Sequence, residues 1–143
     1  MKKYWINDEM FQQGFYLIPG CSVKDLDKYL TKEYGVVSEL SNYTVGSVLT
    51  MINTEDDTTV VYLWIKELHW TIKGQSTLIH ELSHLVFRNL ERAMISHSRE
   101  TDEVFAYYIQ HFFKQIHSKL AYVSRSTKTR DKKRNKVLEK RKK

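Results

Sequence analysis

The stretch His80-Glu81-Leu82-Ser83-His84 has the residue types and spacing of a metal site that activates water. Histidines four residues apart lie on one face of a helix, so both imidazoles can reach a single ion. Glu81 is rotated by about 100° from His80, which places its carboxylate beside such an ion and off the line of its ligands. A carboxylate in that position can act as a base on metal-bound water. The stretch therefore predicts a hydrolytic metal centre.

A hydrolytic zinc site also needs a third protein ligand and an open position. Glu103 is the best candidate, because an antiparallel helix that returns after a spacer of 18 residues brings it back beside the histidines. The small Ala106, one turn later, leaves room for close packing of the two helices. Asp102, His97 and His111 stay open as alternatives. Acidic residues at a helix start also favour the helix dipole, which is a purely structural explanation for Asp102 and Glu103.

The alternative to a metal site is a pair of surface or half-buried histidines that bond to water or to neighbours. HExxH is a short motif, and short motifs also arise by chance. Its context favours the metal site, because both histidines avoid the apolar stripe of the helix that carries them. We expect that helix to begin near Thr77, with Ser76 as its cap, and to end near Ala93. The stripe consists of Leu78, Leu82, Leu85, Val86 and Leu90.

The elements around the motif form an α+β pattern. Stretches rich in Val, Ile, Thr, Tyr and Trp predict strands, and a polar segment at 53–58 predicts a hairpin between two of them. Ser22 and Gly35 have the residue types of an N-cap and a C′ residue around a helix. The expected strands are Phe15–Ile18, Thr44–Ile52 and Thr59–Lys66, and the other expected helices cover 23–34 and about 101–123.

The charge of the chain is divided unevenly between two segments. The whole chain has 143 residues and a formal charge of +6. Residues 124–143 contain 11 basic and 2 acidic residues, a net +9, so residues 1–123, with 12 basic and 15 acidic residues, carry −3. We expect one folded domain over 1–123 and a basic, disordered tail over 124–143. The tail can also act as a non-specific, phosphate-contacting arm for nucleic acid.

The composition excludes several classes of protein. The single Cys21 rules out an internal disulfide framework and fits a reducing compartment. No apolar run is long enough to span a membrane. Asp8 and Glu9 fall where a signal peptide needs its apolar segment. We therefore expect a cytoplasmic protein with no membrane contact.

The HELSH motif, followed by Glu103-Val-Phe-Ala106, resembles the HExxH…ExxA arrangement of gluzincin metallopeptidases. The nearest likeness is to small zincin-like peptidases encoded by bacteriophages and prophages, which place a Trp-containing hairpin strand before a TLxHExxH helix. The resemblance implies a minimal zincin-like domain: a small antiparallel sheet packed on the HExxH helix and on a second, C-terminal helix. It also implies that strand Thr59–Lys66 lies along the cleft and pairs with an extended peptide.

The resemblance further implies one zinc ion per chain, held by His80, His84 and Glu103, with Glu81 as general base. Tyr107 stands where several gluzincin families have Asp, so the carboxylate that would orient a ligand histidine is not identified. A donor to the oxyanion of the reaction is also expected. The candidates are Tyr107, His97 and His111.

Three functions follow from these observations. The first is a zinc metallopeptidase that acts on a peptide or protein substrate. The second is a catalytically silent phage structural or morphogenesis protein with the zincin fold. The third is a nucleic-acid-binding protein that acts through its basic tail, with HELSH incidental.

Overall fold

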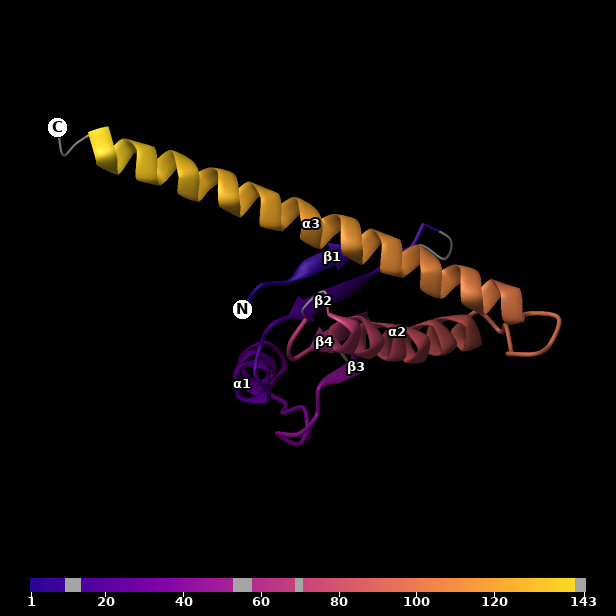
Figure 1. The fold of residues 1–143 in the computed structure, drawn as a ribbon. Helices are drawn as coiled ribbons and strands as arrows, with labels where there is room; N and C mark the ends of the chain where they lie inside the picture. The colour runs from indigo at the N-terminus through magenta and orange to yellow at the C-terminus, as the bar shows by residue number, and fades with distance from the viewer. Residues whose placement is uncertain (10–13, 53–57, 69–70, 141–143) are drawn as a thin grey trace. The chain divides into compact units, whose positions relative to one another are not determined.

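The structure is a computed structural model that describes residues 1–9, 14–52, 58–68 and 71–140, with side chains described up to residue 121. These ranges form a mixed sheet and three helices (Figure 1), which confirms the α+β class. The elements are β1 (Tyr4–Ile6), β2 (Phe15–Pro19), α1 (Val23–Tyr34), β3 (Gly46–Ile52), β4 (Thr59–Ile65), α2 (Ile72–Arg92) and α3 (Asp102–Lys140). Most of the predicted hairpin link, 53–57, lies outside the described residues.

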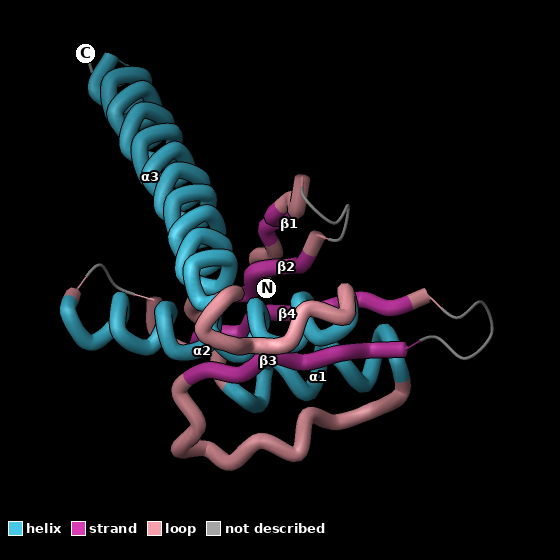
Figure 2. Tube along the Cα trace, turned by 90° about the vertical axis from the view of Figure 1, so that its right-hand side faces the viewer, coloured by secondary structure: helices cyan, strands magenta, loops and turns pink. Residues whose placement is uncertain are grey.

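The four strands lie in the order β1-β2-β4-β3 (Figure 2). β3 and β4 form the predicted antiparallel hairpin, in which Gly46 lies opposite Ile65 and Val48 opposite Leu63. β2 pairs with β4 in parallel, so the sheet is mixed and not the small antiparallel sheet that was expected. The end of β2 and the start of β3 lie at the same end of the sheet, since Pro19 and Gly46 both pair with Ile65. β3 therefore runs opposite to β2, and the hairpin turns β4 back into the direction of β2.

The two faces of the sheet are covered by different helices. On one face, α1 packs its buried Leu26 and Leu30 against Tyr62 and Trp64 of β4. The indole N–H of Trp64 donates a hydrogen bond to the carbonyl of Cys21, 3.0 Å away. Directly paired residues of neighbouring strands share a face, and strand side chains alternate between the two faces. Leu63 and Ile65 therefore lie on the opposite face, where α2 packs.

The helices agree with the predictions to different degrees. α1 has the predicted cap and end, since the Ser22 hydroxyl accepts from the N–H of Asp25 and Gly35 adopts a left-handed conformation with φ of 70°. The predicted start of α2 near Thr77 is wrong. Thr71 caps it instead, because its hydroxyl accepts a hydrogen bond from the N–H of Gly74. The whole predicted apolar stripe of α2 is buried.

Helical backbone in α3 continues to Lys140, past the predicted helix end at 123. The basic, disordered tail over 124–143 stays a prediction. No Pro or Gly interrupts this stretch, and Lys and Arg are good helix formers. The chain divides into two compact units, 1–113 and 114–143. Within the described ranges, no helix combines the length and apolar character needed to cross a membrane.

A buried polar pair joins the N-terminal segment to the first part of α3. Asp8 is fully buried, and the hydroxyl of Tyr108 donates a hydrogen bond to its carboxylate. Burial, together with this bond and the charge of Asp8, raises the pKa of the Tyr108 hydroxyl. The ring of Tyr108 lies 4.7 Å from that of Phe112, which in turn packs edge-on against Phe15 of β2. The pair therefore sits within the core of unit 1–113.

We predict that Tyr108→Phe lowers the free energy of unfolding by about 1–3 kcal/mol, because a buried carboxylate loses a hydrogen-bond donor. Chemical denaturation monitored by circular dichroism measures the change. Tyr107→Phe is the matched control, since Tyr107 is 71% exposed and its removal should change stability by less than about 0.5 kcal/mol. Equal stability of the two variants would contradict the assigned role.

Candidate active site

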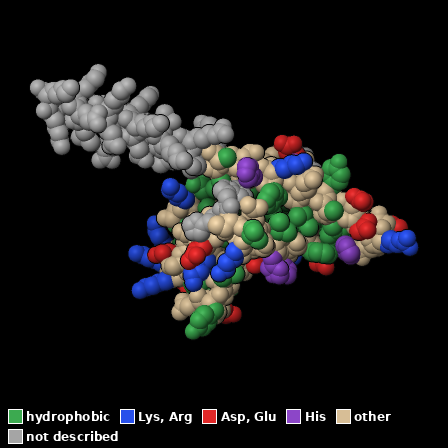
Figure 3. Space-filling model, in the orientation of Figure 1, with side chains coloured by type: hydrophobic (Ala, Val, Ile, Leu, Met, Phe, Trp, Pro, Cys, Tyr) green, Lys and Arg blue, Asp and Glu red, His purple; other side chains and the backbone are tan. Residues whose placement is uncertain are grey.

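The two histidines of the motif lie on the exposed side of α2 and converge. The Nε2 atoms of His80 and His84 are 3.2 Å apart, and the two rings are nearly perpendicular. Figure 3 shows histidine side chains at the surface over α2. Two imidazole nitrogens that bind one tetrahedral zinc ion, each at about 2.0–2.1 Å, lie about 3.3 Å apart. In this structure the separation is that of a hydrogen bond between the two rings, and it also matches the separation of two nitrogens that bind a single zinc ion.

Glu81 lies beside the histidine pair and is buried against the sheet. Its side chain is 7% exposed and packs over Gly46, the first residue of β3. A Cβ on Gly46 would lie only 2.6 Å from Cγ of Glu81, so a glycine is what permits this close approach. Burial raises the pKa of the Glu81 carboxyl, and the neighbouring imidazoles and Arg88 oppose that rise.

Glu103 does not join the histidine pair in this structure. It lies exposed in the first turn of α3, where its backbone N–H donates to the Asp102 carboxylate at 2.8 Å. The Phe87 ring of α2 is 4.7 Å from the Phe105 ring of α3. Because the two helices run in opposite directions (Figure 1), Glu103 lies level with the part of α2 after Phe87, more than a turn past His84.

The fit of these residues to a zinc ion is therefore partial. Within the part of the chain that the structure describes, no three His, Cys, Asp or Glu side chains are grouped closely enough to hold a metal. The histidine pair has the spacing of two ligands, and no third candidate side chain lies with it among the described residues.

The remaining sequence candidates occupy other surroundings. His97 is exposed and lies against two rings that also contact each other, 5.4 Å from Phe87 and 4.8 Å from Phe105, so it belongs to the aromatic cluster at the junction of α2 and α3. His111 is half-buried, with its ring 5.6 Å from that of Phe112. Tyr107 is largely exposed, one turn after Glu103. These positions do not assign the oxyanion donor to any of the three.

The strand that borders the site is β3. The prediction that Thr59–Lys66 pairs with an extended peptide is wrong, because β4 is hydrogen-bonded to β2 on one side and to β3 on the other. The N–H of Lys66 donates to the Val45 carbonyl at 2.9 Å. Since bonded and non-bonded pairs alternate in an antiparallel ladder, the backbone groups of Gly46, Val48 and Thr50 point to the outer edge. No described strand pairs with this edge.

Arg88 is a residue of the site that the motif analysis missed. Its Nη1 donates to the carbonyl of Val48 at 2.9 Å, on the outer edge of β3. Arg88 lies four residues after His84, so the helical spacing that identified the histidines extends to it and could have indicated it. Gly46 was missed as well, because only the tertiary approach of α2 shows what it contacts.

Comparisons of this chain with protein-family models, with curated proteins and with solved structures found no match.

Proposed function

We propose that this chain is a zinc-dependent metallopeptidase that hydrolyses peptide bonds, with His80 and His84 as metal ligands and Glu81 as general base. The observation that carries the proposal is the 3.2 Å separation of the two Nε2 atoms. Beside them lies a buried carboxylate, packed against a strand whose outer edge has no described partner strand. Together these features supply metal ligands, a base and a surface that can align a peptide.

Zinc, when bound, polarises a substrate carbonyl and lowers the pKa of a water molecule at the site. The carboxylate of Glu81 would accept a proton from the attacking water molecule and deliver it to the leaving amine. Its contact with Gly46 restricts where that carboxylate can lie. A base held in one place needs little reorganisation during the reaction.

We propose Glu103 as the third ligand, recruited when the ion binds. Its side chain is exposed, but it lies more than a turn past His84, so its recruitment requires the first turns of α3 to shift along α2 as well as a change of rotamer. The outer edge of β3 is the surface on which an extended peptide would pair, since its backbone N–H and C=O groups point away from β4. This replaces the strand first predicted for that role with its neighbour in the hairpin.

We predict that the purified protein binds about one zinc ion per chain, as a single three-ligand site implies. His80→Ala and His84→Ala should each lose the metal, as measured by elemental analysis after gel filtration. His117→Ala is the control, since His117 is an exposed histidine outside the motif. Zinc retained equally by all the variants would contradict the assigned ligands.

We predict that Glu81→Gln keeps the metal and lowers the rate of peptide hydrolysis by about 10²–10⁴-fold, the usual contribution of a general base. Cleavage of an unfolded protein substrate, followed by mass spectrometry, measures the loss. Glu33→Gln, an exposed site on α1, should cleave like wild type. A wild-type protein that holds zinc but cleaves nothing would favour the silent structural protein instead.

We predict that Gly46→Ala retains zinc but reduces turnover by about 10²-fold, because the new methyl group displaces the Glu81 side chain. Ser47→Ala is the neighbouring control, since residue 47 faces the other side of the sheet. Steady-state kinetics and metal content are measured on both variants. Unchanged turnover in Gly46→Ala would show that Glu81 does not need the position it holds here.

A further inference from the structure

Two arginines continue the line of the histidines along α2. His80, His84, Arg88 and Arg92 follow one another at intervals of four residues and so form a single row on the helix. Along the helix axis, Arg88 lies about 6 Å and Arg92 about 12 Å beyond His84. The row runs in the same direction as β3, because Glu81 contacts Gly46 and Arg88 bonds to Val48.

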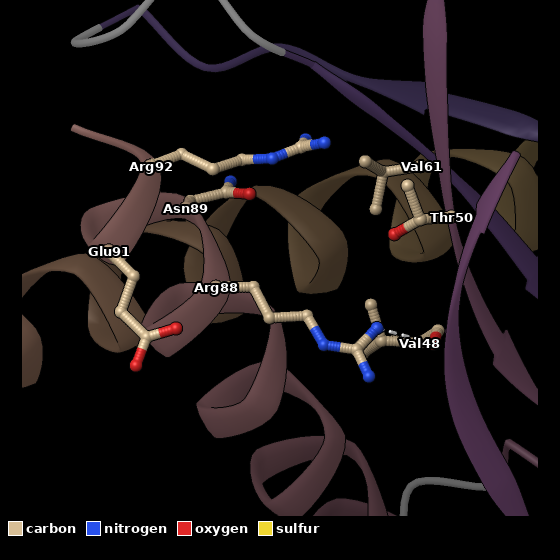
Figure 4. A pocket seen from close by; sticks show the side chains of 7 residues that line it. All are labelled: Val48, Thr50, Val61, Arg88, Asn89, Glu91 and Arg92. Atoms are coloured by element: carbon tan, nitrogen blue, oxygen red, sulfur yellow. Dashed lines mark hydrogen bonds between the residues drawn. The ribbon is translucent and has the colours of Figure 1, made fainter. Parts of the chain in front are cut away.

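A pocket of about 540 Å³ opens between the arginines and the sheet. Figure 4 shows both guanidinium groups extended from α2 towards the strands, whereas the carboxylate of Glu91 points away from them. The hydroxyl of Thr50 and the carboxamide of Asn89 point into the pocket as well. The residues that line it are Val48, Thr50, Val61, Arg88, Asn89, Glu91 and Arg92.

The chemistry of this pocket suits a carboxylate on a short aliphatic stem. Arginine presents five N–H donors in a planar fork that matches a carboxylate, and the bond from Arg88 to Val48 uses only part of its set. The Thr50 hydroxyl and the Asn89 amide can donate further hydrogen bonds. Val48 and Val61 offer an apolar wall for methylene groups.

We propose that this pocket binds the acidic side chain of an extended peptide that pairs with the outer edge of β3. The preferred substrate then carries Glu or Asp about two to four residues from the scissile bond, since strand residues advance about 3.4 Å each and the arginines lie about 6–12 Å beyond His84 along α2. The inference rests on the proposed function for the position of the scissile bond. The attraction between the pocket and a peptide carboxylate depends only on the positive charges of Arg88 and Arg92.

A peptide carboxylate fits this position better than a free anion does. Val48 and Thr50, which line the pocket, also belong to the strand that would hold a peptide, through the outward backbone groups of Gly46 and Thr50 and the N–H of Val48, because the Val48 carbonyl already accepts from Arg88. Side chains of a paired peptide alternate in direction, so every second one can turn towards α2. A single chain can thus use the strand edge and the arginine pocket together.

The test measures binding of fluorescein-labelled extended peptides to the full chain by anisotropy, in the Glu81→Gln background so that no peptide is cleaved. Two peptides differ only in a single Glu or Gln. We expect the Glu peptide to bind about tenfold tighter or more, as a hydrogen bond to a charged group implies. Arg92→Gln should remove this preference, whereas Arg99→Gln, an exposed arginine outside the pocket, should keep it.

Equal binding of the two peptides, or a Glu preference that survives Arg92→Gln, would overturn the inference. So would displacement of both peptides by inorganic phosphate with no Glu preference, which would reveal a general anion site. Failure of the proposed peptidase function can be distinguished from failure of the proposed acidic-side-chain pocket. An Arg92-dependent Glu preference in a chain with no Glu81-dependent cleavage would support the pocket and refute the peptidase, and cleavage without that preference would do the reverse.

Discussion

The close approach of α2 to the start of β3 is the constraint on which the candidate site depends. Glu81 can lie against the sheet only because residue 46 has no side chain. With Glu81 turned inwards, the helical geometry leaves His80 and His84 on the outer side of α2, beside the edge of the strand. One contact between a helix and a glycine therefore sets the positions of the base, both histidines and the strand edge relative to one another.

The rest of the fold holds this contact in place. α1 covers one face of the sheet and packs on the central strand through Tyr62 and Trp64. This leaves the other face to α2, whose leucines are fully buried. The first turns of α3 pack beside α2 through Phe87 and Phe105. Because these contacts are apolar and extensive, the exposed histidines contribute little to packing, and their convergence has no evident role in the core.

Local signals in the sequence were sufficient for most features that depend on neighbouring residues. The Ser22 cap, the left-handed Gly35 and the apolar stripe of α2 were all predicted, because each is decided within a few residues. The start of α2 was not, since Thr71 and Ser76 are both suitable caps and the sequence does not rank them. The histidine pair was predicted because helical spacing alone brings the two rings together.

Features that depend on tertiary arrangement could not be read from the sequence. Strand propensity identified β3 and β4 but could not say which of them lies at the edge, and that decides where a peptide can pair. The position of Glu103 along the axis of α2, relative to His84, depends on how Phe105 packs on Phe87. The arginine pocket likewise exists only because α2 runs alongside β3.

Zinc K-edge X-ray absorption on the zinc-loaded protein tests the central claim most directly, because it reports the atoms bound to the ion. Two imidazole nitrogens and one carboxylate oxygen at about 2.0–2.2 Å are the predicted ligands. A spectrum with fewer than two imidazoles, or with sulfur at about 2.3 Å, would show that His80 and His84 do not hold the metal together.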